Sequence, residues 1–283
     1  MLEFCSDRNF RNFPSFGKDL TRNFRLPLSL ALQSPPMRTN KILSIVVAAV
    51  LTIFIQHTRA ADEAAEGGKP LINKDMSGWK LKDSNNTKTW KIVSDVKLDA
   101  NDPKKLVATG ENPGDSPALF RQPVDHGTDL YTEQAFGDIE LHVEFVVPKS
   151  SNSGVYLMGR YEVQVLDSFG RPDDKLTQGD VGAIYSSAKP STNASKAPGE
   201  WQAFDIIFQA PRFEGGKKTQ NAKFISVKLN GKEIQKNVEA KAPTGGQLYN
   251  EEAPTGPLLL QGDHGIVAFR NIRVSEKKTV AQR

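Results

Sequence analysis

The chain has 283 residues, of which 25% are charged and 38% hydrophobic, a composition typical of a soluble globular protein. Collagen-like, coiled-coil and disulfide-scaffold proteins are excluded. The formal charge of +4 would indicate a nucleic-acid partner only if it belonged to the folded part of the chain. Residues 1–60 contain eight of the 37 basic residues and three of the 33 acidic residues, which leaves 29 basic and 30 acidic residues in the remainder. We therefore expect no nucleic-acid partner.

The N-terminal region contains a second methionine that is followed by the pattern of a secretory signal. Met37 precedes a short basic region, an uncharged and mostly apolar stretch at 42–55, and a small-x-small cleavage site that ends at Ala60. The apolar stretch is shorter than the roughly 20 residues that span a bilayer, which disfavours an uncleaved anchor. The sequence predicts a signal peptide at 37–60, a non-native extension at 1–36, and no stable membrane insertion after cleavage.

The single cysteine, Cys5, lies in the predicted extension, so we expect a mature protein without thiol or disulfide. Cysteine nucleophiles, thiolate metal sites and redox roles are thereby excluded. Export without disulfides favours a bacterial protein that is secreted or periplasmic. After the signal, the sequence predicts a linker at 61–69, one domain at 70–276 and a C-terminal tail at 277–283.

The predicted domain shows a period of two residues in its hydrophobic pattern, which is typical of strands with one face in a core. Asn230-Gly231 between two such strands indicates a type I′ hairpin, because both central positions of that turn need positive φ. The sequence therefore predicts an all-β fold, an antiparallel two-sheet jelly-roll sandwich. The alternating apolar positions are Ile139, Leu141, Val143 and Phe145; Phe204, Ile206 and Phe208; and Ile266, Ala268, Ile272 and Val274, which share their parity with Arg270.

The segment 155–166 alternates over twelve residues and is predicted as one strand with two different faces. If one set packs between the sheets, the other lines the outer face of its sheet, where it is either a solvated surface or a ligand-binding face. Aromatic, amide and charged groups in a row favour ligand binding, because they supply stacking surface and fixed hydrogen-bonding groups. The predicted core set is Val155, Leu157, Tyr161, Val163 and Val165, and the predicted outer set is Tyr156, Met158, Arg160, Glu162, Gln164 and Leu166.

Asp167 follows this segment with the parity of the core set. A β-bulge at Leu166 would bring Glu162, Gln164 and Asp167 to one surface. The spacing Glu-x-Gln-x-x-Asp then resembles, with substitutions, the Glu-x-Asp-x-x-Glu strand of the laminarinase-type glycoside hydrolases, which use two carboxylates on a jelly-roll sandwich.

Between Leu71 and Val274, successive segments of the chain resemble, in order, the motifs of the 3-keto-disaccharide hydrolase family. The resemblance implies a concanavalin A-like lectin/glucanase fold, export by bacteria, and action on glycosides whose glucose unit is oxidised at C3. One departure concerns Tyr185, which is followed by two serines where many members continue with glycine, so that the loop shape differs there. The matching segments are 152–156, 159–168, 182–185, 198–202 and 261–265 through 269–273.

The implied reaction fits the residue types. A ketone at C3 acidifies the C2 proton, so the glycosidic bond can break by elimination and water can add back, which needs a general base, an acid and a group that polarises the carbonyl. Glu162 is the first candidate for base or acid, with a raised pKa if Tyr156 and Met158 desolvate it. Arg160 or His264 is a candidate for polarising an oxygen. The catalytic candidates are Glu162, Asp167 and His264, and the substrate-binding candidates are Tyr156, Arg160, Gln164, Glu144, Asn152, Tyr185, Trp201 and Gln261.

Several candidates have an equally simple structural interpretation. His264 could hydrogen-bond within its loop, Trp201 could close the core, and Asn152 could hold a turn. Glu144 and His142 share a parity that also suits a surface. The parity of Arg270 favours a partly buried structural ion pair.

Asp173, Asp174 and Asp180 lie in a loop whose oxygens could bind calcium, but a solvated loop is the preferred interpretation, and neither a metal nor a cofactor is predicted. The predicted partner is an oligosaccharide or glycoside substrate, and the predicted activity is that of a glycoside hydrolase. The alternatives are a lectin or carbohydrate-binding module on the same fold, and a scaffold protein of a cell-surface assembly.

Overall fold

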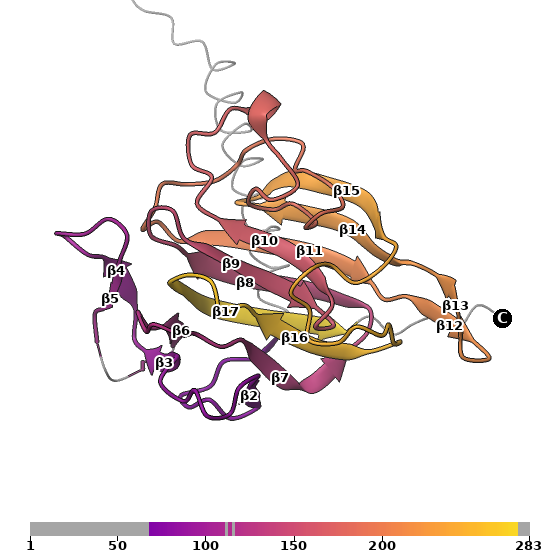
Figure 1. Ribbon diagram of the computed structural model, residues 1–283, viewed down its shortest axis with the longest axis horizontal. Helices are drawn as coiled ribbons and strands as arrows, with labels where there is room; N and C mark the ends of the chain where they lie inside the picture. The colour runs from indigo at the N-terminus through magenta and orange to yellow at the C-terminus, as the bar shows by residue number, and fades with distance from the viewer. Residues whose placement is uncertain (1–67, 111–112, 115–116, 277–283) are drawn as a thin grey trace, which may run out of the picture. The chain divides into compact units, whose positions relative to one another are not determined.

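The computed structural model describes residues 68–276 except 111–112 and 115–116, and it shows strands joined by loops (Figure 1). The predicted extension, the signal peptide, most of the predicted linker and the C-terminal tail lie outside the described residues. In the part that is described, no helix has the length and apolar character needed to cross a bilayer.

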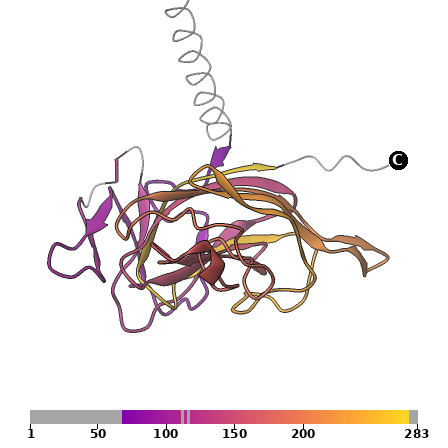
Figure 2. The same ribbon diagram turned by 90° about the horizontal axis from the view of Figure 1, so that it is seen from above.

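Two antiparallel sheets lie face to face as separate layers (Figure 2). The larger sheet has eight strands, in the order β15 (Lys232–Ala240), β14 (Ala222–Leu229), β11 (Gln202–Gln209), β8 (Ile139–Val146), β17 (Val267–Glu276), β6 (Ala118–Arg121) and β3 (Trp90–Val93), with β1 (Lys69–Pro70) also paired with β17. The smaller sheet has five strands, in the order β10 (Tyr161–Leu166), β9 (Asn152–Leu157), β16 (Gly256–Leu260), β7 (Leu130–Phe136) and β2 (Trp79–Leu81). Two hairpins, β4 (Val96–Leu98) with β5 (Leu106–Ala108) and β12 (Arg212–Glu214) with β13 (Lys217–Gln220), and a 3₁₀ turn at Asp173–Lys175 complete the fold.

One hydrophobic core fills the space between the two sheets, and the alternating positions of β8 and β11 supply it as predicted. In β8 and β11 every second residue is buried, and Phe145 stacks on Phe204 with ring centroids 4.8 Å apart. The five predicted core residues of 155–166 belong to the same buried cluster. The predicted all-β, antiparallel sandwich is confirmed.

The hairpin between β14 and β15 also has the predicted turn. Asn230 and Gly231 take φ values of 53° and 80°, and Leu229 pairs with Lys232 across them. These two positive φ values define the type I′ geometry that Asn-Gly favours.

The parity predicted for the last strand is wrong before its bulge and correct after it. The register of β17 against β8 shifts between Arg270 and Arg273, and Asn271 takes a φ of 48°. Because this bulge exchanges the two faces of the strand, Ala268 joins a small cluster on the outer face of the larger sheet, whereas Ile272 joins the main core. Alternation alone gives no sign of an inserted residue.

The segment 155–166 is not one strand but the hairpin of β9 and β10. Met158 and Gly159 take φ values of 56° and 62°, and the Arg160 N–H donates to the Leu157 carbonyl across the turn. The face predicted for most positions is nevertheless correct, because Val155 pairs directly with Val163 and Tyr156 with Glu162. Met-Gly is a weak hairpin signal, since positive φ is uncommon for a residue such as methionine.

Candidate active site

The outer face of the smaller sheet carries a polar cluster on β9 and β10. Tyr156 lies directly opposite Glu162, and Gly154 lies directly opposite Gln164. β10 is an edge strand, and two loops cover its free edge. The Gln164 N–H donates to the Ala183 carbonyl at 3.0 Å, and the Glu162 N–H donates to the Thr244 hydroxyl at 3.0 Å. The two loops that contain Ala183 and Thr244 therefore enclose the cluster.

A cavity of about 200 Å³ opens over this cluster. It is smaller than the roughly 300–1,000 Å³ of pockets for drug-sized ligands. Seven of the eleven predicted site residues line it. The lining residues are Asn152, Tyr156, Glu162, Gln164, Tyr185, Gly245, Gly246, Gln261 and His264.

Glu162 is an acid held in an environment that disfavours its charge. Its side chain is almost completely buried, with 2% of its surface exposed. Burial raises the pKa of Glu162 to about 8, the carboxylates of Asp129 and Asp263 add to the rise, and the Tyr156 hydroxyl opposes it. The carboxyl group is therefore mostly protonated at neutral pH, and it can donate a proton where an ordinary glutamate would be ionised.

Asp129 is a buried carboxylate with a partner at each of its oxygens. Lys82 lies 3.0 Å from one of its oxygens, and the Gly262 N–H donates to the other at 3.0 Å. The Asp129 carboxylate is one of the two that add to the rise in the pKa of Glu162.

Tyr156 and Gln261 form a hydrogen-bonded pair on one side of the cavity. The Tyr156 hydroxyl donates to the Gly245 carbonyl at 2.9 Å, and Gln261 Nε2 lies 3.4 Å from the hydroxyl oxygen as its donor. Burial raises the pKa of Tyr156 well above its ordinary value, and the nearby Glu162 carboxyl adds to the rise. The phenol therefore stays neutral.

His264 lines the cavity from the more exposed side, where half of its side chain is accessible to solvent. Its Nδ1 is hydrogen-bonded to the neighbouring Asp263 carboxylate. With the Nδ1 proton directed at Asp263, Nε2 is the basic nitrogen of the ring, and the carboxylate stabilises the imidazolium that forms when Nε2 takes a proton. The pair has the chemistry of a general base.

Asn152 and Gln164 are held to each other at another part of the cavity wall. Gln164 Nε2 donates to Asn152 Oδ1 at 2.6 Å. This leaves the Asn152 amide nitrogen as a donor. Tyr185, one-third exposed, is an accessible aromatic surface in the same lining.

Two predicted site residues near this hairpin do not line the cavity. Arg160 donates through Nη1 to the Met158 carbonyl at 2.8 Å and packs over the Tyr249 ring, so it holds the turn and the loop between β15 and β16. Asp167 accepts hydrogen bonds from the backbone N–H groups of Ser150 and Phe169. β10 ends at Leu166 with no bulge there, and Asp167 acts as a cap of the adjoining turns.

Glu144 and Trp201, predicted to bind substrate, lie on the outer face of the larger sheet. Arg270 Nε donates to Glu144 at 2.6 Å, and the Arg270 guanidinium covers the Trp201 ring at 4.0 Å from its centroid. The ring face is thus unavailable for stacking on a sugar. Arg270 forms the structural ion pair that its position predicted.

His142 completes this network on the larger sheet. Burial lowers the pKa of His142, but its interactions with Asp205 and Glu144 outweigh that effect and raise the pKa to about 9. Burial raises the pKa of Glu144, but His142, Asn271 and Arg270 together lower it to about 2. Both groups are charged at neutral pH, which makes the network a structural one.

The loop that contains the three aspartates is organised by hydrogen bonds. Asp180 is fully buried and accepts from Thr177, Ser168 and Arg171. Asp173 accepts from Thr192 and from the Asn193 N–H. Within residues 68–276, apart from the two short gaps, no group of three or more His, Cys, Asp or Glu side chains is arranged to hold a metal ion.

The sequence reasoning missed the glycines that shape the cavity. A Cβ atom at Gly246, which takes a φ of 77°, would lie 2.7 Å from the Tyr156 hydroxyl. At Gly154 a Cβ would overlap the Glu162 carboxyl group. The adjacent pair Gly245-Gly246 was the available signal, because two glycines in a loop often mark a close approach of backbone to another group.

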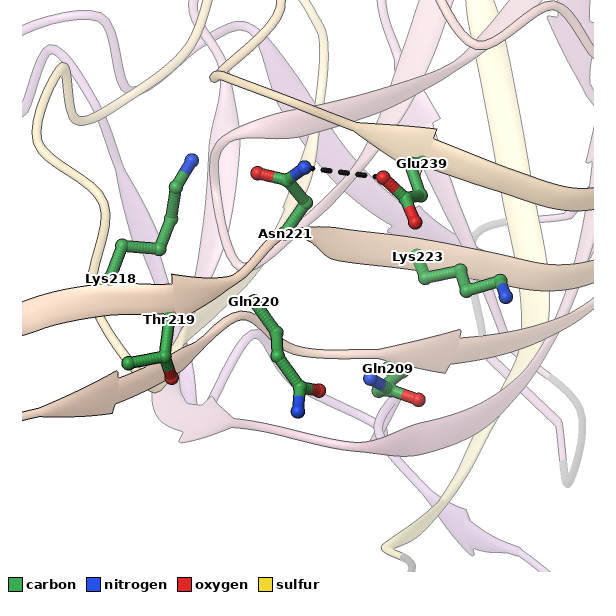
Figure 3. Close-up of a pocket in the computed structure, with 7 residues that line it drawn as sticks. All are labelled: Gln209, Lys218, Thr219, Gln220, Asn221, Lys223 and Glu239. Atoms are coloured by element: carbon green, nitrogen blue, oxygen red, sulfur yellow. Dashed lines mark hydrogen bonds between the residues drawn. The ribbon is translucent and has the colours of Figure 1, made fainter.

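A larger hollow of about 500 Å³ lies where β13 meets β14, away from these residues (Figure 3). Its side chains do not converge on one point: the ammonium groups of Lys218 and Lys223 point away from each other (Figure 3). Asn221 and Glu239 are joined by a hydrogen bond of 3.2 Å. The smaller cavity, which holds the acid with the raised pKa, is therefore the candidate active site.

Comparisons with known proteins agree with this fold and place the chain in a family. A crystal structure from Parabacteroides distasonis ATCC 8503, provisionally named a glycosyl hydrolase, is 28% identical, with a TM-score of 0.55 over 75% of this chain and 84% of that chain. A second one from the same organism, named in the same way, is 17% identical, with a TM-score of 0.52 over 77% of this chain and 97% of that chain, and it supports the fold alone. No curated protein matches significantly. The family model of the 3-keto-alpha-glucoside-1,2-lyase-like domain matches residues 67–275, and the chain belongs to this family.

Proposed function

We propose that the protein cleaves 3-keto-glycosides by elimination across C1 and C2 of the oxidised sugar, with Glu162 and His264 as the proton-transfer groups. The observation that carries the proposal is a buried carboxyl group, with a pKa raised to about 8, in a cavity that a histidine–aspartate pair also lines. Membership of the 3-keto-alpha-glucoside-1,2-lyase-like family supports the same chemistry.

The C3 ketone allows the glycosidic bond to be cleaved with few catalytic side chains. It acidifies the proton at C2, because the carbanion formed there is stabilised as an enolate. A single base can therefore start the cleavage, and the two carboxylates of an ordinary glycosidase are not required. The described cavity contains one glutamate, which fits this requirement.

His264 suits the role of base and Glu162 the role of acid. His264 Nε2 takes the C2 proton, and Asp263 stabilises the resulting imidazolium. The electron pair of the C2–H bond forms the C1–C2 double bond as the C1–O bond breaks. The protonated Glu162 gives its proton to the departing oxygen, which leaves as the alcohol, and the sugar remains as a 1,2-unsaturated 3-ketone.

Addition of water returns both groups to their starting states. Glu162, now a carboxylate, takes a proton from the water whose oxygen adds to C1, the position conjugated to the ketone. His264 returns its proton to C2. The net result of both steps is hydrolysis to the 3-keto sugar and the alcohol. The first step alone is a lyase reaction.

The predicted location is part of the proposal. The basic and apolar segments after Met37, with their cleavage site, support export, and the lack of cysteine after residue 5 supports a bacterial compartment outside the cytoplasm. Glycosides from outside the cell would be the substrates there.

The test is incubation of the purified protein with 3-keto-trehalose or 3-keto-maltose and with the unoxidised parent sugars. We expect the oxidised sugars alone to release a 1,2-unsaturated ketone or 3-keto-glucose, and Glu162→Gln to lose this activity. Cleavage of the parents at a similar rate would contradict the role of the ketone. Binding of the oxidised sugars without release would identify a carbohydrate-binding module instead of an enzyme.

A further inference from the structure

Gln261 lies at the end of the central strand of the smaller sheet, and its backbone is held on both sides. Its N–H donates to the Gly154 carbonyl at 2.9 Å, and its carbonyl accepts from the Ser153 hydroxyl at 2.7 Å. These two bonds fix the position of the Gln261 backbone against β9. The side chain lines the cavity and is 5% exposed.

The hydrogen bonds around the side chain define which way the amide faces. Nε2 lies 3.4 Å from the Tyr156 hydroxyl oxygen, and that hydroxyl gives its own proton to the Gly245 carbonyl. Toward Gln261 the hydroxyl oxygen can therefore act only as an acceptor. This places the amide NH₂ of Gln261 toward Tyr156 and Oε1 away from it.

Gln261 Oε1 is buried and has no hydrogen-bond partner among the residues that the structure describes. Buried polar atoms in folded proteins are nearly always paired, so one without a partner calls for a specific explanation. An acceptor that lines a cavity is explained most simply by a donor on the ligand. The oxygen of a ketone is itself an acceptor and cannot fill this position, whereas a sugar hydroxyl can.

We propose that Gln261 Oε1 accepts a hydrogen bond from one hydroxyl group of the bound sugar and thereby determines substrate specificity. The proposal rests on the function proposed above and extends it: the hydroxyl at Gln261 turns the C3 ketone toward donors elsewhere in the cavity, such as the Asn152 amide nitrogen. Sugars that lack this hydroxyl leave Oε1 buried and unpaired, and the site rejects them.

The experiment compares Gln261→Met with the unchanged protein on methyl 3-keto-α-glucoside and on its 2-deoxy, 4-deoxy and 6-deoxy analogues. Methionine keeps the length of the side chain and removes the acceptor. We expect Gln261→Met and one of the deoxy analogues each to lower kcat/KM about 100-fold or more. The two changes together should lower it no further than either alone, because both remove the same hydrogen bond.

Gln202→Met is the matched control. Gln202 is a buried glutamine whose Oε1 accepts from the Lys196 N–H at 2.9 Å, away from the cavity. We expect this variant to lose thermal stability and to discriminate among the deoxy analogues as the unchanged protein does. If the losses from Gln261→Met and from every deoxy analogue are simply additive, Gln261 only supports Tyr156, and the proposal is wrong.

Two further outcomes separate this proposal from the proposed function. If no 3-keto-glycoside is cleaved, calorimetry measures the Kd of the methyl 3-keto-α-glucoside and its three deoxy analogues for both proteins. If Gln261→Met and the loss of one hydroxyl together weaken binding no further than either alone, the role of Gln261 is still supported. The absence of measurable binding of all four overturns it. If Gln261→Met does not fold, the unchanged protein alone decides, because equal rates on all three deoxy analogues contradict a required hydroxyl.

Discussion

Gly154 and Glu162 share one small space on the outer face of the smaller sheet, where a Cβ atom at Gly154 would overlap the Glu162 carboxyl group. Gly154→Ala should therefore push the carboxyl group out of its position. Overpacking of this kind costs about 1–3 kcal/mol of unfolding free energy. A displaced proton-transfer group loses turnover on the order of a hundredfold. Thermal unfolding and the rate of 3-keto-trehalose cleavage measure the two effects.

Gly179→Ala is the control for this substitution, because the nearest atom to a Cβ there is Thr177 Oγ1 at 3.9 Å. It should leave both the melting temperature and the turnover close to those of the unchanged protein. Normal turnover in Gly154→Ala would show that the position of the Glu162 carboxyl group is not critical.

The burial of Glu162 predicts a characteristic dependence of stability on pH. Its pKa rises from 4.5 to about 8 on folding, so between these values the folded state holds a proton that the unfolded state has released. The free energy of unfolding therefore falls as the pH rises through this window. Above a pH of about 8, Glu162 causes no further change in it. Glu162→Gln removes the effect. The melting temperature of Glu162→Gln minus that of the unchanged protein should therefore increase from pH 5 to pH 9.

A fixed difference between the two proteins over this range would contradict the raised pKa. The comparison is specific, because other groups near the cavity, including Asp129, Asp263 and His264, are present in both proteins. This expectation differs from that for an exposed carboxylate, whose replacement would change stability by less than about 0.5 kcal/mol at any pH.

Activity should decline on the alkaline side with the ionisation of the same group. If Glu162 is the acid, kcat/KM falls about tenfold for each pH unit above its pKa of about 8. Asp129→Asn should shift this decline toward lower pH, because the Asp129 charge contributes to the rise of the pKa. Measured pH–rate profiles of both proteins provide the test. A decline at the same pH in Asp129→Asn would mean that another group titrates.

Much of the fold follows from the sequence, because a buried sheet face imposes a period of two on the residues that form it. Val155 and Val163 were placed on the same face correctly even though the chain reverses between them, since a hairpin in this register pairs residues of one face. The reversal itself was not predicted, because Met158 at positive φ is held there by its surroundings and not by its own preference.

Alternation predicted the candidate site only where it lies on strands. Tyr185, Gln261 and His264 lie in loops, and they were predicted from segments that resemble the family's motifs. Tyr156 and Glu162 follow from alternation, and their pairing across two strands brings them together. Glu144 shares the same pattern of alternation but belongs to the other sheet, and alternation does not say which sheet a strand joins. Asp129 acts on Glu162 from outside the cavity lining, and no local pattern encodes such a long-range relationship.

The distinction between Glu144 and Glu162 can be tested by the same substitution at both positions. Glu144 is a half-buried carboxylate on β8 that holds Arg270, Asn271 and His142, so Glu144→Gln should lower the unfolding free energy by about 1–3 kcal/mol at neutral pH. Because the folded pKa of Glu144 is lowered to about 2, this contribution is present above 4.5 and is lost as the pH falls through about 2. The stabilities of the two proteins should therefore converge in acid.

Turnover of Glu144→Gln at a temperature below its melting transition should stay within about twofold of normal, since the network lies on the sheet opposite the cavity and touches none of its lining residues. Glu200→Gln, at an exposed position, serves as the control that changes neither property. Glu162→Gln should give the reverse pattern, with stability kept or increased and turnover lost. A loss of more than about tenfold in kcat/KM for a fully folded Glu144→Gln would place substrate on the outer face of the larger sheet and contradict the assignment of the cavity.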